Sequence, residues 1–324
     1  MKRKATALTL VVAFLFSFLF HGLLVQPVKA QSFETIVIRA DGSVEGTDKI
    51  QREEDVYTTL ISDINASIVV ERDNVVLNGA SYILQGDGNV NGITLDDIRN
   101  TTVKNLKLSC FNIGILVMGS DNNKILEITI TDSFRGLDLT SSENNTVSGN
   151  YITNNNDGIA LENIYNNIVE NIITNNTNIG IFLNGAGYNN IIKNNITKNS
   201  RGILVHICYN NVIYHNNFVN NTNHVETDDS NAIWDNGKEG NYWSDYEERY
   251  PDATETAVSG IWNTPYIISE NNQDNYPLIA PVETPSFQEE TDESEVLPII
   301  VVISLIVITL VALGIFIYLK EPKR

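Results

Sequence analysis

Glycine and apolar positions recur every 22 residues through the middle of the chain. The glycine column is Gly92, Gly114, Gly136, Gly158, Gly180 and Gly202, and an apolar residue follows each glycine one and three positions later. A second apolar column is Val103, Ile125, Val147, Val169, Ile191 and Ile213. A third is Leu108, Ile130, Ile152, Ile196 and Phe218, with Thr174 as a polar member. Apolar residues at i and i+2 within each short stretch are typical of β-strands, not helices.

Each 22-residue unit therefore predicts three short strands separated by turns, which is one coil of a parallel β-solenoid. A single coil cannot bury its apolar edge, so coils stack about 4.8 Å apart and merge their inward columns into one core. We expect an all-β fold with 22-residue coils over residues 92–223 and N-terminal coils or a cap over residues 31–91. An aromatic-rich cap is expected over residues 224–281, which hold all three tryptophans, because an open solenoid end exposes its core.

The two ends of the chain carry export and anchoring signals. Residues 1–30 have a basic start, a long apolar run and a small-residue cleavage pattern, which predicts a signal peptide; an uncleaved anchor is the alternative. Residues 297–319 lack charge and would span roughly 34 Å as a helix, enough to cross a bilayer. The basic tail, residues 320–324, predicts a cytoplasmic C-terminus. Residues 282–296 read as an acidic stalk, so we expect a single-pass cell-membrane protein with its ectodomain outside.

Charge and cysteine content exclude several classes of protein. The 21 basic and 40 acidic residues give a net charge of −19, and no basic block is present, so nucleic-acid binding is excluded. The expected exported segment, residues 31–296, holds 14 basic and 39 acidic residues, a net charge of −25. Two cysteines cannot form a disulfide scaffold or a Cys-built metal site. Cys110 and Cys208 should lie four coils, about 19 Å, apart, which predicts two free thiols.

The 43 asparagines, about 13% of the chain, gather at predicted turns. One turn column holds Asn100, Asn122, Asn144, Asn166 and Asn210, with Tyr188 as the exception, and the next holds Asn123, Asn145, Asn167, Asn189 and Asn211. Asparagine tolerates the left-handed backbone of a tight corner, and stacked amides can hydrogen-bond from coil to coil. We interpret both columns as structural.

Three segments carry a resemblance to a known family. The first is the repeat, which reads Asn-Asn-x-Ile/Val, then Asn, then Gly-Ile-x-Leu. The second is the head at residues 38–44, and the third is the tail at residues 234–246 with its Gly-Asn-Tyr-Trp-Ser-Asp-Tyr stretch. Together they resemble NosD-type proteins of the pectin-lyase-like superfamily over roughly residues 35–281. The resemblance implies a right-handed parallel β-helix, exported, often membrane- or envelope-attached and frequent in archaea. It also implies a choice of roles, because the founding members mature a periplasmic copper site, whereas the superfamily includes polysaccharide lyases, hydrolases and epimerases.

The copper role has few candidate ligands in this chain. Soft copper sites use Cys, Met and His, and the only cluster is His206, Cys208, His215 and His224. Scattered surface histidines are the competing interpretation of this group. We expect no cofactor.

A polysaccharide-active enzyme would place its acids on the outward face of the strand that contains each glycine. That face offers Arg135, Asp138, Asp157 and Glu162 as candidate catalytic residues. Asp138 and Glu162 would lie on the order of 8 Å apart, which suits the acid/base pair of an inverting hydrolase. Solvated charges on the outer surface of a solenoid are the competing interpretation.

Binding without chemistry is the third possibility and the one that we favour from the sequence. Tyr165, Tyr188 and Tyr209 fall one coil apart at one corner and could stack on sugar rings, with Phe182 extending an apolar strip beside them. Packing of the tyrosines on one another is the alternative. The sequence thus predicts a cell-surface binding or scaffold module for carbohydrate or an envelope polymer, with the enzyme and copper-maturation roles as alternatives.

Overall fold

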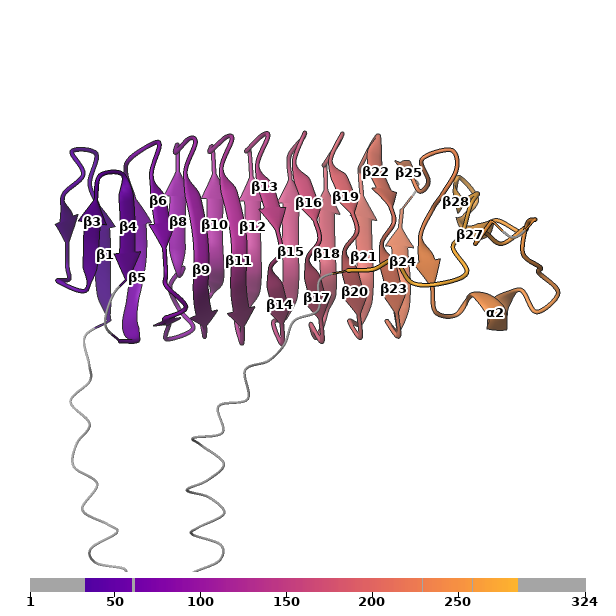
Figure 1. Ribbon diagram of the computed structural model, residues 1–324, viewed down its shortest axis with the longest axis horizontal. Coiled ribbons are helices and arrows are strands. Elements are labelled where there is room, and N and C mark those ends of the chain that lie inside the picture. Colours follow the sequence, from indigo (N-terminus) through magenta and orange to yellow (C-terminus); the bar gives the residue numbers. More distant parts are fainter. Residues whose placement is uncertain (1–32, 60–61, 229, 258, 285–324) are drawn as a thin grey trace, which may run out of the picture. The chain divides into compact units, whose positions relative to one another are not determined.

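Residues 33–59, 62–228, 230–257 and 259–284 are described by the computed structural model. They form a stack of parallel β-coils that runs from the N-terminal strands to an irregular C-terminal segment (Figure 1). The predicted signal peptide, membrane helix, cytoplasmic tail and most of the stalk lie outside these residues. No helix within the described ranges is both long enough and apolar enough to cross a membrane.

Every coil contributes one strand to what we call the glycine sheet, because it contains the glycine column. Its strands pair in parallel, each with the strand of the next coil. They are β1 (Glu34–Ile38), β5 (Ile64–Val70), β8 (Ile93–Asp96), β10 (Ile113–Met118), β12 (Arg135–Thr140), β15 (Asp157–Glu162), β18 (Ile179–Asn184), β21 (Arg201–His206) and β24 (Asn223–Thr227).

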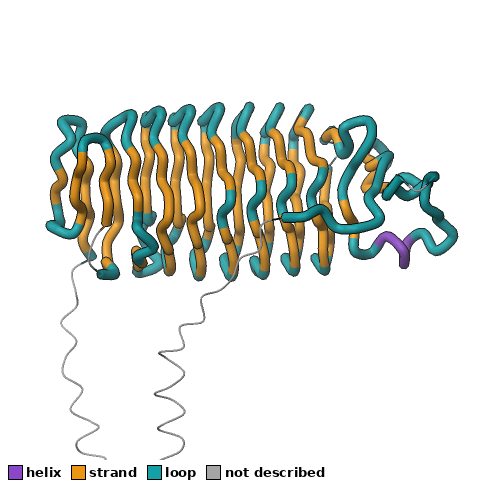
Figure 2. Tube along the Cα trace, viewed as in Figure 1, coloured by secondary structure: helices purple, strands orange, loops and turns teal. Residues whose placement is uncertain are grey.

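The other two strands of each coil form two further parallel ladders, and Figure 2 shows their turns aligned at the corners of successive coils. The second ladder comprises β4 (Val56–Thr59), β6 (Val76–Asn78), the first halves of β9 (Thr102–Ser109) and β11 (Lys124–Thr131), β13 (Thr146–Ser148), β16 (Asn167–Val169), β19 (Asn190–Ile192), β22 (Asn211–Tyr214) and β25 (Ala232–Ile233). The third comprises β7 (Ile83–Gln85), the second halves of β9 and β11, β14 (Tyr151–Thr153), β17 (Ile172–Thr174), β20 (Asn195–Thr197), β23 (Asn217–Val219) and β26 (Tyr242–Trp243). At the N-terminal end, β2 (Val44–Glu45) and β3 (Ile50–Glu53) pair antiparallel with β1 and β4.

The predicted glycine column is confirmed, and its cause is close approach between coils. A Cβ atom on Gly158 would lie 2.4 Å from the carbonyl oxygen of Gly180 in the next coil, closer than real Cβ contacts allow. The apolar columns fill the interior, with Ile159 and Leu161 fully buried. Both cysteines are free thiols, as the predicted coil register requires.

The register corrects two members of the apolar columns. Ile168 pairs with Val147, and Ile173 pairs with Ile152, so neither Val169 nor Thr174 occupies a core column. The turn at residues 163–166 is one residue shorter than its counterparts, and the turn at 175–178 is one residue longer. The two changes cancel before the next glycine. Thr174 is therefore not a polar substitution in the core, because Ile173 fills that position.

Three ladders of buried hydrogen bonds run along the interior corners. In each, a side-chain oxygen accepts the backbone N–H of the equivalent residue one coil earlier. The first runs through Asn123, Asn145, Asn166, Asn189 and Asn211, the second through Asn150, Asn171, Asn194, Asn216 and Asn241, and the third through Ser133, Asn155, Asn176, Asn199 and Asn221.

The structural role predicted for asparagine holds, with one reassignment. Asn100, Asn122, Asn144 and Asn210 have left-handed backbone, with φ between 53° and 58°. Tyr165 and Tyr188 complete this column, at φ of 59° and 55°. Asn166 leaves it and joins the buried ladder in place of Asn167, because the short turn shifts the register by one residue.

The C-terminal segment closes the stack with aromatic rings. The strands β24, β25 and β26 still pair with the preceding coil, so coil pairing continues past residue 223 although the 22-residue spacing ends there. Trp243 stacks between Phe218 of the last regular coil and Tyr266, at ring-centroid distances of 4.3 and 4.1 Å. The helix α2 (Tyr246–Arg249) and the hairpin of β27 (Tyr266–Ser269) and β28 (Asn272–Asp274) complete this segment.

A buried carboxylate joins β28 to the last coil. Asp274 is fully buried and accepts hydrogen bonds from the Asn241 N–H at 2.7 Å, the Trp243 Nε1–H at 2.9 Å and the Tyr276 N–H at 3.0 Å. Burial raises the pKa of Asp274 to about 6, and these three donors oppose that rise. The group therefore changes charge within a mildly acidic range in the folded chain.

Stability should respond to pH through Asp274. Between about pH 4 and pH 6 the folded chain holds a proton that the unfolded chain has released, so the free energy of unfolding falls as the pH rises, and levels off above pH 6. Each pKa unit corresponds to about 1.4 kcal/mol, so the fall is roughly 3 kcal/mol. Urea denaturation of the wild type and Asp274→Asn from pH 4 to 7 isolates this contribution. A stability difference between the two that does not change with pH would contradict it.

Candidate functional site

The outward face of the glycine sheet presents three rows of side chains. The residues one before, two after and four after each glycine form these rows, as the sequence predicts. The first row is Ile113, Arg135, Asp157, Ile179, Arg201 and Asn223; the second is Leu116, Asp138, Ala160, Phe182, Leu204 and Glu226; the third is Met118, Thr140, Glu162, Asn184 and His206. Each row gains one side chain per coil.

An arginine between two carboxylates organises the N-terminal part of this face. The Arg135 Nη1 atom donates to Asp138 Oδ2 at 2.5 Å, and its Nη2 atom lies 3.8 Å from Asp157 Oδ2. The Thr140 hydroxyl donates to the other oxygen of Asp138 at 2.8 Å. Asp138 and Asp157 are only 6% and 5% exposed. Three of the four predicted catalytic residues are thus brought together in one ion-paired group.

Hydrogen bonds continue from this group toward the C-terminal end of the sheet. The amide of Asn178 donates to Asp157 Oδ1 at 2.8 Å, and Arg201 donates to the amide oxygen of Asn178. Arg201 also lies 3.5 Å from Glu226. The polar contacts therefore run without a break across the coils of β12, β15, β18, β21 and β24.

Glu162 lies apart from the ion-paired group. It pairs in register with Thr140, one coil on and two positions along from Asp138, as predicted for the acid/base pair. Its side chain is exposed and accepts a hydrogen bond from Asn184 at 3.2 Å. Each oxygen of Asp138 already has a partner in Arg135 or Thr140. The structure therefore places Glu162 and Asp138 in different hydrogen-bond groups.

An apolar strip occupies the centre of the face. The second row reads Ala160, Phe182 and Leu204 between the carboxylates of Asp138 and Glu226. Phe182 and Leu204 are half-buried, so part of each side chain remains accessible. The third row beside the strip is polar, with Glu162, Asn184 and His206, whereas the first row has the apolar Ile179 between Asp157 and Arg201.

The three predicted tyrosines meet at the corner that follows the third row. Tyr165, Tyr188 and Tyr209 are 47%, 44% and 45% exposed. The rings of Tyr165 and Tyr188 stack at 5.3 Å, and Tyr209 meets Tyr188 edge-on at 5.5 Å. The Tyr209 ring lies over Gly187, where a Cβ atom would come within 2.5 Å of it. Because the rings pack on one another, they offer less free ring face for sugar stacking than three separate tyrosines would.

The three histidines among the four candidate copper ligands are held by different partners. His206 contacts Asp228 at 2.6 Å, and His215 contacts Glu239 at 2.8 Å. His224 lies 3.3 Å from Asp245. Among the described residues, no group of three or more His, Cys, Asp and Glu side chains has an arrangement that could hold a metal ion. Burial raises the pKa of the Cys208 thiol, which favours the protonated form over the thiolate that metals bind.

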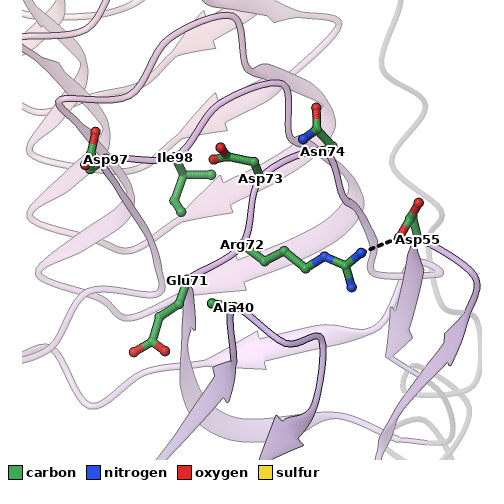
Figure 3. A pocket seen from close by; sticks show the side chains of 8 residues that line it. All are labelled: Ala40, Asp55, Glu71, Arg72, Asp73, Asn74, Asp97 and Ile98. Carbon is green, nitrogen blue, oxygen red and sulfur yellow. Dashed lines mark hydrogen bonds and ion pairs between the residues drawn. The ribbon is translucent and has the colours of Figure 1, made fainter.

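The structure has two cavities that the repeat pattern of the sequence does not predict. One, of about 580 Å³, lies beside the turn after β5 (Figure 3). Its lining includes Asp55, Glu71, Asp73 and Asp97, and its Arg72 is paired with Asp55 at 2.8 Å. The lining of this cavity is therefore mainly acidic. The other cavity lies at the C-terminal segment and is treated below.

Comparisons with solved structures return β-helical epimerases at low similarity. A mutant of the periplasmic alginate epimerase AlgG shows a TM-score of 0.40 and 16% identity over 60% of this chain and 55% of that one. A double mutant of AlgG gives 0.32 and 15%, over 60% and 72%. The A-module of mannuronan C-5 epimerase AlgE6 from Azotobacter vinelandii gives 0.26 and 10%, over 60% and 71%. The chain thus spans about half the length of the first of these structures. A comparison of this chain with curated proteins gave no match.

The family comparison covers most of the coil stack. A family model described as periplasmic copper-binding protein (NosD) matches residues 47–248, from the first coils to the helix of the C-terminal segment. This match takes in more than half of the chain and includes the repeats and the Gly-Asn-Tyr-Trp-Ser-Asp-Tyr stretch, two of the three segments on which the sequence resemblance rested; the head at residues 38–44 lies outside it. The chain therefore belongs to the NosD family of parallel β-helix proteins.

Proposed function

We propose that this protein binds an extended, neutral polysaccharide outside the cytoplasm, along the outward face of the glycine sheet. The observation that carries the proposal is the apolar strip, whose accessible members are Phe182 and Leu204 because Ala160 is fully buried. Asp157 and Arg201 of the first row and Asn184 and His206 of the third row lie near it. Sugar rings have apolar faces and polar edges, so such a strip can contact the ring while the flanking rows bond to hydroxyl groups. Successive side chains within a row are about 4.8 Å apart, which suits a polymer that is built of repeating units.

The charges of the face favour a neutral polymer. Arg135 and Arg201 are both engaged with neighbouring side chains of the protein. Glu162 and Glu226 remain exposed beside the strip. The segment from residue 31 to residue 296 has a net charge of −25, so a polyanion would be repelled at long range.

Binding without turnover is favoured by the state of the candidate catalytic groups. Asp138 pairs with Arg135 and Thr140, and Asp157 pairs with Arg135 and Asn178. A general acid or base must reach the reacting atom of its substrate. Here both carboxylates are directed into contacts with the protein and are almost completely buried.

Calorimetric titration of the purified full-length chain tests the proposal. The probes are cello-, manno- and chito-oligosaccharides of two to eight units, with oligogalacturonates as the anionic comparison. Phe182→Ala should weaken binding of the preferred neutral oligosaccharide about tenfold, because an aromatic contact contributes about 1–1.5 kcal/mol. Leu116→Ala, in the same row but beyond Asp138, is the matched control and should leave the affinity unchanged.

Three outcomes count against the proposal. Tighter binding of the oligogalacturonates would reject a neutral ligand, and an unchanged affinity in Phe182→Ala would reject the strip as the contact surface. Shortened or unsaturated products, detected by mass spectrometry after prolonged incubation, would show that the protein cleaves the polysaccharide and is an enzyme instead of a binding module. In that case Asp138→Asn is the variant that should abolish turnover.

A further inference from the structure

A second cavity, of about 300 Å³, lies between the last coil and the C-terminal segment. Residues 222–224 of the coil line one side, and Asp245, Glu248 and Arg249 line the other. In Figure 1 the helix α2, which contains two of these residues, lies beyond β24 at the C-terminal end of the stack. The repeat pattern gives no sign of this cavity, since half of its lining belongs to the irregular segment.

We infer that this cavity binds the terminal sugar unit of the polysaccharide that lies along the glycine sheet, an inference that rests on the proposed function. The position of the cavity is the first argument. Asn223 pairs in register with Arg201, in the same outward row as Arg135 and Asp157. A polymer that follows this row toward the C-terminus therefore arrives at the cavity.

The walls of the cavity are fixed by buried contacts. His224 is 7% exposed, and its Nδ1 and Nε2 atoms lie 3.3 Å from the amide nitrogen of Asn221 and from Asp245 Oδ1, respectively. The Tyr266 hydroxyl donates to both oxygens of Asp245 at 3.1 Å. Tyr266 in turn stacks on Trp243. The site is thus arranged before a ligand enters, which reduces the entropy lost on binding.

The groups that line the cavity match sugar hydroxyls. A hydroxyl both donates and accepts hydrogen bonds. The Asn223 amide and the Thr222 hydroxyl can donate to it, whereas Asp245 and Glu248 can accept from it. Within the described ranges Glu248 is exposed and forms no ion pair, so its carboxylate can turn toward a ligand.

Asp245 is ionised at neutral pH and so provides a strong acceptor. Its partial burial alone would raise its pKa, but the hydrogen bonds from His224 and Tyr266 and the charge of Arg249 outweigh burial and lower it. The lowered pKa agrees with the contacts that hold this carboxylate in the cavity wall.

The same contacts disfavour an anionic sugar. Arg249 is the one arginine that lines the described cavity, and it is already engaged. Its Nη2 atom donates to the Ile267 carbonyl oxygen at 3.0 Å, and its guanidinium lies 4.4 Å from the centre of the Tyr266 ring. A uronate would meet Asp245 and Glu248 without a free arginine to bind its carboxylate, so the cavity fits a neutral unit.

The test compares monosaccharides with oligosaccharides on the full-length chain. Glucose, mannose and N-acetylglucosamine are titrated by calorimetry together with their oligomers of two to eight units. We expect one monosaccharide to bind and Glu248→Gln to weaken its binding about tenfold, because a charged carboxylate acceptor is replaced by a neutral amide that accepts a weaker hydrogen bond. Glu247→Gln, a neighbour on α2 outside the cavity lining, is the control and should leave the affinity unchanged.

The outcomes separate this inference from the proposed function. Glu248→Gln should weaken both monomer and oligomer, whereas Phe182→Ala should weaken only the oligomers. If Phe182→Ala weakens the oligomers but Glu248→Gln has no effect on either ligand, the cavity is not the end site and the sheet face stands. If only Glu248→Gln has an effect, the cavity stands and the sheet face fails. If no saccharide binds, both are overturned.

Discussion

Replacing Asn171 with alanine should lower the free energy of unfolding by about 4 kcal/mol. The Asn171 side chain is fully buried, and its oxygen accepts the backbone N–H of Asn150 at 3.1 Å. Its Nδ2 group donates to the Val147 and Val169 carbonyl oxygens and to Asn194 Oδ1. Alanine would leave these groups in a dry interior, and each unsatisfied buried group costs about 1–3 kcal/mol. Chemical denaturation followed by circular dichroism measures the loss.

A matched asparagine in the next coil provides the control. The Asn190 side chain is partly exposed and donates one hydrogen bond, to Asn167 Oδ1 at 2.9 Å. Asn190→Ala should therefore cost at most about 1 kcal/mol. Equal losses in the two variants would show that the interior ladders contribute no more than surface amides, which would contradict the prediction.

Replacing Gly240 with alanine should separate the C-terminal segment from the coil stack. A Cβ atom there would lie 1.8 Å from Asp274 Oδ1, so the carboxylate must move. Asp274 would then lose its bonds to the Asn241 N–H and the Trp243 indole. Both are buried donors to a charged group, and we expect a loss of stability of at least about 3 kcal/mol.

The effect of Gly240→Ala should be visible in the tryptophans before the coils unfold. Trp243 is 1% exposed in the folded chain, so its release should shift the emission to longer wavelength. Limited proteolysis should then cut within residues 246–276 while the coils remain intact. Lys238→Ala, with an exposed side chain two residues away, is the control. Native emission and protease resistance in Gly240→Ala would refute the proposed link through Asp274.

The coil stack could be predicted because its stabilising contacts repeat. A Gly158-type close approach and an Ile159-type core position recur in the six regular coils from Gly92 to Gly202, so one period in the sequence predicts the architecture of most of the stack. The sequence repeat did not predict the one-residue shift at Ile168 and Ile173, because the altered lengths of two turns cancel before Gly180. A search based on the glycine spacing cannot detect a change that restores that spacing.

The candidate sites were predictable only where they follow the repeat. Arg135, Asp138 and Asp157 could be placed on one face because their positions relative to the glycines were known. Their pairing into one group depends on side-chain conformations that the spacing does not determine. The cavity beside His224 and Asp245 is lined both by a coil and by a segment without a repeat. The periodicity of the sequence therefore could not predict that these residues lie close together.

The asparagine ladders also determine how such a protein can change in length. The Asn171 side chain bonds within its own coil, to the coil before it and to the coil after it, and to no coil farther away. A duplicated 22-residue unit that keeps asparagine at the three ladder positions would reproduce the same contacts at both of its junctions. Gain or loss of whole coils should therefore be tolerated during evolution. Each added coil would lengthen each outward row by one side chain and leave the terminal structures unchanged.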